Sequence, residues 1–237
     1  MKKFLASVFI LLVFGGAVFY IGWTQFKVKA DYIGIVVSKT NGIDKIPVEN
    51  GKFSWHKEFL LPTNATIKLF SIQPVNVNKT VSGELPSGAV YSAIFNSNDN
   101  FSYSFDFSIS VTLAPEKIPE LLQDNKISND EDLQQYLEKA CDTIAQLSAD
   151  YLLKKVSENP MFRSESIRRD DILRSIQIYK EFPEIDITAF AILSTKLPDY
   201  VLYTKIQEQF LSGQSIQNIE SDNQNNLEFS SLEGYNE

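Results

Sequence analysis

The clearest pattern in the chain is an uncharged, mostly apolar run near the N-terminus, residues 4–23. A bilayer core about 30 Å thick needs roughly 20 apolar helical residues to cross it. The run ends in Tyr20 and Trp23, whose rings favour the level of the lipid headgroups. We therefore expect a membrane anchor over residues 1–26. Its candidate membrane residues are Phe4, Leu11, Leu12, Phe19, Tyr20 and Trp23.

A cleaved signal peptide is the alternative for this segment, because Lys2 and Lys3 precede the apolar core. The core is longer than the usual 7 to 15 or so residues of a signal peptide. No good cleavage site follows it, which favours an anchor but leaves cleavage open. A short basic N-terminus usually stays in the cytoplasm, which places the domain outside; Lys27 and Lys29 beyond the run keep the cytoplasmic side open as well.

After the anchor, short apolar stretches separated by turn residues predict a series of strands. Residues 28–39 are rich in β-branched side chains, and Asn41-Gly42 supplies a turn. Pro62 and Pro74 interrupt the pieces that follow. Further strands are expected at residues 51–55, 59–62 and 66–77. Residues 78–100 are rich in Ser, Asn and Gly and predict a loop, with at most a short strand around 90–95.

Residues 101–113 give the most regular alternation in the chain. The odd-numbered positions are aromatic or aliphatic, and the even-numbered positions are Ser, Asp or Thr. Period two over this length predicts a long strand with one buried face and one wet face.

Apolar residues spaced by three and four predict helices in the second half. Ser128 and Glu131 form a capping-box sequence for a helix that runs to about Val156. Asp170 or Asp171 is expected to cap the next helix, which ends at Pro183. A strand at 185–193 and a last helix at 199–211 complete the pattern.

These elements predict the α+β class: a transmembrane helix, then a domain with a mostly antiparallel sheet and packed helices. The expected divisions are an anchor at 1–26, the domain at 27–211 and a tail at 212–237. The tail is polar and acidic and contains no Lys or Arg, a composition typical of disorder.

In order and spacing, four stretches resemble the SPFH (band 7) superfamily of stomatin, prohibitin and flotillin. They are VKADYIGIVVSKTNG, GKFSWHKEFLLP, FDFSISVTLAPEKIPELL and DDILRSIQIYKEFPEIDITAFAILSTKLPDYV. Two departures accompany the likeness. The family's glycine before the last strand is absent from Phe182-Pro183-Glu184-Ile185, and helical pattern stops near residue 211, where the family continues into a coiled coil.

The resemblance implies a non-enzymatic scaffold that organises membrane microdomains or regulates a membrane protease or channel. It implies membrane lipids and copies of itself or related SPFH subunits as partners, and no cofactor. The alternative is a monomeric, membrane-tethered domain that binds a ligand or peptide. A candidate self-association surface is the apolar stripe of Leu133, Leu137, Ile144 and Leu147, although packing of this stripe on the protein's own sheet is the favoured interpretation.

Charge changes the picture near the anchor. The chain carries a net charge of −8, yet residues 24–80 have eight lysines against four carboxylates. A basic part beside the anchor fits an anionic membrane surface, with Lys27, Lys29 and Lys39 as candidates. Solvated strand edges explain scattered lysines equally well. An acidic chain without a dense basic cluster argues against nucleic acid.

Residues that carry chemistry are few. His56 is the single histidine, so no multi-histidine metal site exists, and a Ser-His-Asp relay would have to use it. A structural role is the favoured interpretation of His56. Cys141, the single cysteine, is expected to be a small apolar residue on a helix. No phosphate-binding glycine loop occurs.

Overall fold

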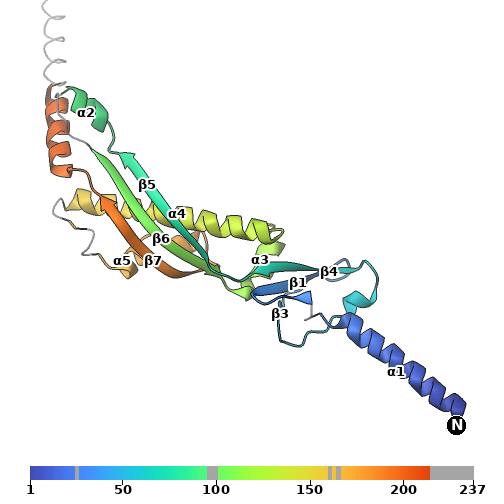
Figure 1. Cartoon of the computed structure of the whole chain (residues 1–237). Helices are drawn as coiled ribbons and strands as arrows, with labels where there is room; N and C mark the ends of the chain where they lie inside the picture. Colours follow the sequence, from blue (N-terminus) through green and yellow to red (C-terminus); the bar gives the residue numbers. More distant parts are fainter. Residues whose placement is uncertain (25–26, 95–100, 160–161, 164–166, 214–237) are drawn as a thin grey trace, which may run out of the picture.

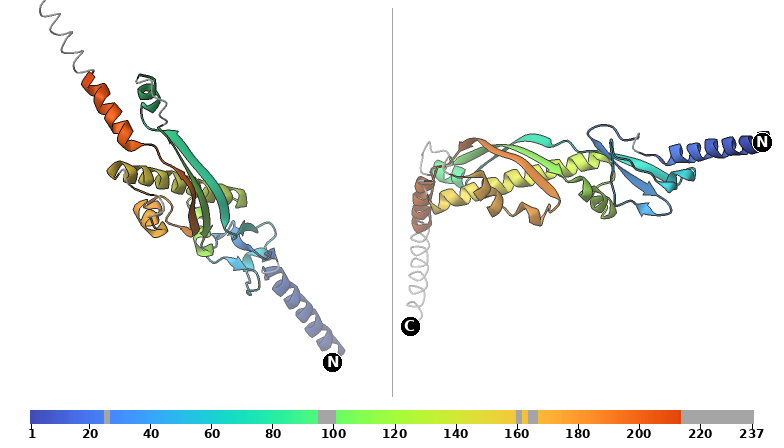
Figure 2. Two further views of the ribbon diagram at one scale, coloured as in Figure 1. Left: turned by 60° about the vertical axis from the view of Figure 1, so that its left-hand side comes forward. Right: turned by 90° about the horizontal axis from the view of Figure 1, so that it is seen from below.

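The computed structural model describes residues 1–24, 27–94, 101–159, 162–163 and 167–213. The molecule is elongated (Figures 1 and 2). The helix α1 (Lys2–Gly22) projects from one end, and a helix formed by residues 200–213 stands at the other. Two antiparallel sheets lie between them, so the predicted α+β class is confirmed.

The smaller sheet lies next to α1 and is built around β1 (Tyr32–Ser38). This strand pairs antiparallel with three others. They are β2 (Gly42–Ile43), β3 (Val48–Glu49) and β4 (Ala65–Ser71). Gly42 has a φ of +74°, which a glycine adopts without steric cost, so the predicted turn at Asn41-Gly42 joins β1 to β2.

The larger sheet has the order β5-β6-β7 and is antiparallel throughout. Its strands are β5 (Val75–Glu84), β6 (Ser102–Leu113) and β7 (Ile185–Lys196). The central strand β6 confirms the alternation of residues 101–113, because its aromatic and aliphatic side chains lie in the core. The final strand confirms the prediction at 185–193 and extends three residues beyond it.

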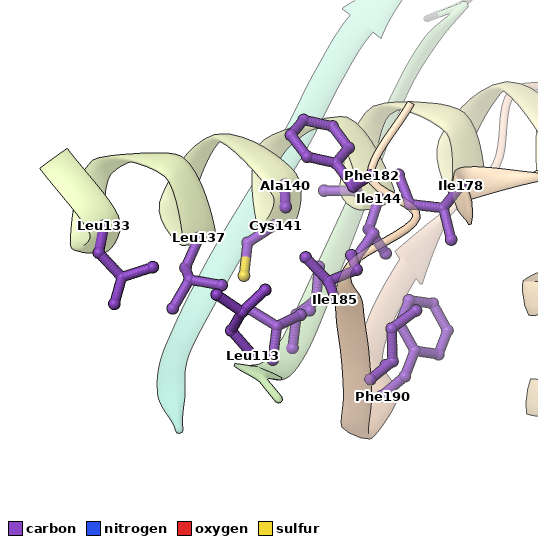
Figure 3. Close-up of a cluster of buried hydrophobic side chains, with 14 of the residues drawn as sticks. Leu113, Leu133, Leu137, Ala140, Cys141, Ile144, Ile178, Phe182, Ile185 and Phe190 are labelled. Carbon is purple, nitrogen blue, oxygen red and sulfur yellow. The ribbon is translucent and has the colours of Figure 1, made fainter. Parts of the chain in front are cut away.

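One long helix, α4 (Asp130–Glu158), covers one face of the larger sheet (Figures 1 and 3). It follows a 3-10 turn (Pro115–Lys117) and α3 (Ile118–Gln123). The predicted cap was one residue early: Asn129 is the N-cap, and its side chain accepts a hydrogen bond from the Asp132 N–H at 2.9 Å. Asp132 in turn accepts from the Ser128 N–H at 2.8 Å, so the cap is reciprocal.

The apolar stripe of α4 packs in the hydrophobic core. Leu133, Leu137 and Ile144 are at most 2% exposed and face the sheet, as Figure 3 shows, and Leu147 packs against the same cluster. The stripe therefore packs on the protein's own sheet, which confirms the favoured interpretation, and the self-association surface proposed for these residues was wrong. The apolar area of Leu133, Leu137 and Ile144 is already buried within one chain, so it cannot drive association.

Three local predictions were also wrong. Residues 51–55 form only an isolated bridge through Trp55, and 59–62 begin within a 3-10 turn (Lys57–Leu60). The expected loop at 78–100 contains most of β5 and the short helix α2 (Gly88–Ile94); residues 95–100 lie outside the described part.

The region before β7 is helical but broken. The helix α5 (Arg169–Ser175) has Arg168 at its N-cap, not Asp170 or Asp171. Gln177, in the left-handed conformation, separates it from a 3-10 turn (Ile178–Lys180). At the far end, residues 200–213 pack on α2 through Tyr91, Phe101 and Tyr203. Of the predicted tail, residues 212–213 belong to this helix, and the rest lies outside the described residues.

Candidate membrane-contact surface

The helix α1 is exposed along nearly its whole length and stands clear of the domain (Figure 1). Within the described residues it is the one helix long and apolar enough to cross a membrane. A signal sequence meets the same criterion of length and composition. The predicted anchor residues from Phe4 to Tyr20 all lie on this helix, and Trp23 caps its end.

Residues 53–61, which we call the collar, contact the end of α1. Phe53 stacks on Phe19 at a ring distance of 5.9 Å and contacts Trp23 at 5.9 Å. Trp55 donates its Nε1–H to the Phe19 carbonyl at 3.1 Å. Aromatic side chains of the domain therefore bind directly to the last turns of the candidate anchor.

Backbone hydrogen bonds join the same two segments. The N–H of Thr24 donates to the Ser54 carbonyl at 3.0 Å, and the N–H of His56 donates to the Gly22 carbonyl at 2.9 Å. Trp23 and Trp55 form an antiparallel bridge between these bonds. Main-chain hydrogen bonds therefore connect the end of the helix to the domain.

The collar is apolar but largely uncovered. Phe53 is 63% exposed and Leu61 is 59% exposed, and Trp55 and Leu60 are also exposed. Ile46, in the loop before β3, is 74% exposed. Exposed aromatic and aliphatic side chains clustered around an apolar helix mark a surface that contacts a membrane or a protein.

Of the three predicted surface lysines, the structure brings two to the collar. Lys27 places its Nζ 3.8 Å from the centre of the Phe59 ring, and the N–H of Lys39 donates to the Asn64 carbonyl just beyond the collar. Lys29 instead lies next to Tyr32, at the end of β1 where Ser71 contacts the start of α4. All three side chains are exposed.

Sequence reasoning missed the collar itself. Phe53, Trp55, Leu60 and Leu61 were assigned to strands because aromatic and branched residues favour strands. Phe53 and Trp55 have partners in Phe19 and Trp23, 30 or more residues away. The usable signal was the mixture of lysines and large apolar side chains in KFSWHKEFLL, a composition typical of a membrane interface.

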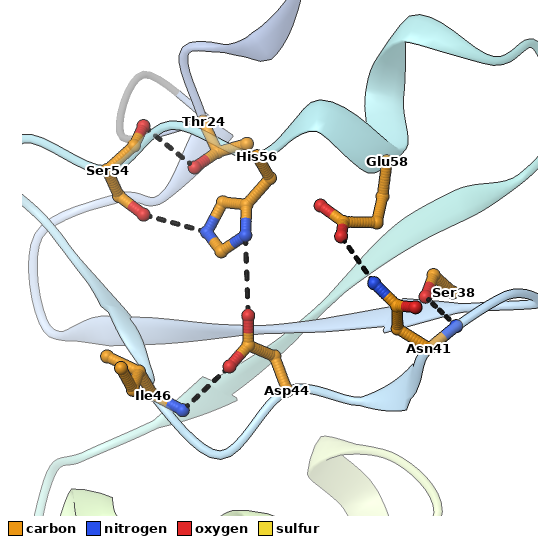
Figure 4. Close-up of polar contacts among 8 residues, drawn as sticks. All are labelled: Thr24, Ser38, Asn41, Asp44, Ile46, Ser54, His56 and Glu58. Atoms are coloured by element: carbon orange, nitrogen blue, oxygen red, sulfur yellow. Dashed lines mark hydrogen bonds and ion pairs between the residues drawn. The ribbon is translucent and has the colours of Figure 1, made fainter.

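Figure 4 shows that His56 is held between two polar side chains. Its Nε2 lies 2.8 Å from the Ser54 Oγ, and its Nδ1 lies 3.4 Å from an Asp44 oxygen. This is the order of groups in a serine hydrolase relay. Here the Thr24 hydroxyl donates to the Ser54 carbonyl, and the other Asp44 oxygen accepts from the Ile46 N–H. These contacts therefore join the collar to Thr24 and to the loop at residues 44–46.

Cys141 is fully buried on α4, as its assignment to a helix core predicted. Burial raises the pKa of its thiol to about 11. The thiol is therefore protonated at neutral pH and has little nucleophilic character.

Comparison with known proteins gives one relative of unknown role. The chain is 23% identical over 192 residues to an uncharacterized protein of Treponema pallidum (strain Nichols). The match covers 80% of this chain and 65% of that protein, so the chain spans less than two thirds of its relative. No family model matches the sequence.

Proposed function

We propose that this chain is a membrane-anchored, non-enzymatic scaffold of the SPFH (band 7) type. Its domain lies against the membrane surface and organises membrane microdomains, or regulates a membrane protease or channel. The observation that carries the proposal is the union of α1 with the exposed apolar collar. A helix able to span the bilayer continues directly into a surface with the composition of a headgroup-level belt.

Two features support this geometry. Lys27 and Lys39 lie beside the collar, where anionic headgroups would meet them. The main-chain bonds of Thr24 and His56 fix the direction in which α1 leaves the domain. A domain attached in this way keeps one end at the membrane, which confines it to lateral contacts with neighbours in the same leaflet.

A second candidate is the membrane-tethered binding domain. The specific observation in its favour is a groove of about 410 Å³ between α5 and β7, far from the collar. Grooves of this size accept small ligands or parts of peptides. The two candidates differ in their requirement for self-assembly.

The native mass of the intact chain in mild detergent separates them. A scaffold of this type gives particles of many copies, while a tethered binding domain gives a monomer or dimer. A monomer at every protein concentration tested, in several mild detergents, would overturn the scaffold. The control is a variant with Gly16→Ala, a substitution that meets nothing within 4 Å and leaves the mass unchanged.

A further inference from the structure

The strand β5 forms an open edge of the larger sheet. All 10 of its residues pair with β6, and within the described part of the chain it pairs with no other strand. None of these residues makes a backbone hydrogen bond to a described residue outside β6. In an antiparallel pair every second residue turns its N–H and C=O away from the partner, so the outer edge of β5 presents unpaired main-chain groups.

Several features that usually protect a strand edge are missing from β5. Proteins block such edges with prolines, bulges or charged side chains that point inward. This strand contains no proline, and its register against β6 runs without a shift from Val75 to Glu84. Its inward-pointing charge is Lys79, but Asp142 of α4 pairs with that ammonium at 2.6 Å. The edge can therefore accept a further strand through main-chain hydrogen bonds.

Carboxylates of α4 border this edge. Glu138 lies four residues before Asp142 and seven after Glu131, so the three share one face of the helix. The hydrogen bond from Lys79 to Asp142 raises the pKa of Lys79, and the charges of Asp142 and Glu138 add to this effect, which places the acidic face beside β5. Glu131 and Glu138 are exposed and make no ion pair with a described residue. One lysine on the strand therefore accompanies three carboxylates on the helix.

Cations at alternate positions of an added strand match this arrangement. On a strand, side chains two residues apart point to the same face and lie about 6.6 Å from each other. Glu138 and Asp142 are separated by about 6 Å along the helix axis. Because α4 covers one face of the sheet, every second side chain of a strand beside β5 turns toward α4. The intervening side chains lie with the exposed polar residues of β5.

A second copy of this chain fits the edge less well. The strand β5 runs from the smaller sheet toward α2, and α1 projects beyond its starting end (Figure 1). Antiparallel pairing of two β5 strands would point the two α1 helices in opposite directions, which two copies anchored in one membrane cannot do. Both copies would also bring the same carboxylates to the seam, where like charges repel. A partner of opposite charge avoids both conflicts.

We propose that the outer edge of β5 binds an extended segment of a partner protein that carries lysine or arginine at every second position. The segment adds to the 3-stranded sheet as a further strand, and its cations pair with Glu138 and Asp142. This inference does not depend on the scaffold function, since strand addition needs only one copy of the chain.

Amide hydrogen exchange on the full chain in mild detergent tests the proposal. The probe is a synthetic peptide, equal to β5 in length, in which lysine and threonine alternate. Its addition is expected to slow the exchange of the outward amides of residues 75–84 by about tenfold. A peptide with glutamate in place of lysine gives no protection. N-methylation of two adjacent central residues removes a donor from each edge of the lysine peptide, and this version gives no protection either.

Two charge reversals in the protein supply the matched comparison. Glu138→Lys is expected to raise the concentration of lysine peptide needed for half-protection by about tenfold, because it sets like charges against each other. Glu181→Lys makes the same change in net charge but leaves that concentration unchanged. Glu181 lies beside Tyr136, on the side of α4 that faces the start of β7.

Three results would overturn the proposal. The first is no protection of β5 by the lysine peptide even at millimolar concentration. The second is equal protection by the lysine and glutamate peptides, or by the N-methylated version. The third is slow exchange of β5 that appears without peptide and increases with protein concentration, since a second copy would then be the occupant.

Discussion

At the residue scale, Glu184 joins three separate segments of the chain. Its carboxylate accepts from the Lys126 Nζ at 2.8 Å and from the Tyr136 hydroxyl at 2.9 Å, and its side chain is 11% exposed. Burial alone raises the pKa of Glu184, but the hydrogen bonds from Lys126 and Tyr136 outweigh it. The net pKa lies below the ordinary value of 4.5. Burial, reinforced by the bond to Glu184, raises the pKa of Tyr136.

A lowered carboxyl pKa means that ionised Glu184 stabilises the folded state. This contribution is complete above about pH 4.5 and is lost as the pH falls through the lower folded pKa. Glu184→Gln is expected to reduce the free energy of unfolding by about 2 kcal/mol at pH 7. The difference from wild type shrinks as the pH drops below 4.5. Urea unfolding at several pH values measures it.

Glu120→Gln is the control, because Glu120 pairs with Lys117 at 3.0 Å but is 60% exposed. Exposed pairs contribute only about 0.3 kcal/mol. Equal losses in the two variants, or a Glu184→Gln loss that persists in acid, would contradict the role given to Glu184.

At the element scale, the junction between α1 and the collar depends on Gly22. A Cβ built on this glycine would lie 2.2 Å from the Trp55 Nε1, closer than any real contact. The Trp55 ring cannot move aside without losing its hydrogen bond to the Phe19 carbonyl. Glycine at this position therefore lets the collar approach the helix backbone.

Gly22→Val is expected to release the collar from α1 while the larger sheet stays intact. Loss of the Trp55 hydrogen bond and its packing costs about 1.4 kcal/mol, which corresponds to roughly tenfold faster amide exchange in residues 53–61. Gly16→Val in the same helix, where nothing lies within 4 Å, leaves that exchange unchanged. Unchanged exchange in Gly22→Val would show that the collar holds without this contact.

The sequence predicts those elements whose pattern arises from their own residues. The strand β6 alternates because one face packs on α4 and the other is wet, so its periodicity is visible. Only the first three residues of its neighbour β5 lay in a predicted strand, because residues 78–100 are rich in Ser, Asn and Gly and indicated a loop. Lys79 also interrupts the valines on the inward face of β5. That lysine is satisfied by Asp142 of α4 at 2.6 Å, a tertiary partner that local sequence does not reveal.

The same distinction applies to the candidate site: features of a single segment were predicted, and contacts between distant segments were not. The length and composition of α1 are properties of one segment, so the anchor helix was predicted. The collar exists only because residues 53–61 fold back on α1, and its contacts join residues 30 or more positions apart. The groove between α5 and β7 likewise requires these two elements to lie side by side.

At the scale of the whole molecule, the two ends have different surfaces. The α1 end carries the exposed apolar collar with Lys27 and Lys39 beside it. The opposite end holds α2 and the helix at 200–213 (Figure 2). These two helices pack through an aromatic cluster of their own. This asymmetry predicts that one end lies at the headgroups while the rest of the domain extends away from them.

Intrinsic fluorescence can measure the depth of the collar. The chain has two tryptophans, Trp23 and Trp55, and both lie at this junction. The full chain is placed in vesicles whose lipids carry bromine atoms either near the headgroup or near the ends of the acyl chains. A Trp55→Phe variant separates the two signals.

We expect strong quenching by the shallow bromines, weak quenching by the deep ones and little quenching by iodide in the water, because the collar lies at headgroup level. Strong quenching by iodide, with no effect of bromines at either depth, would place the collar in water and contradict a membrane-contact surface.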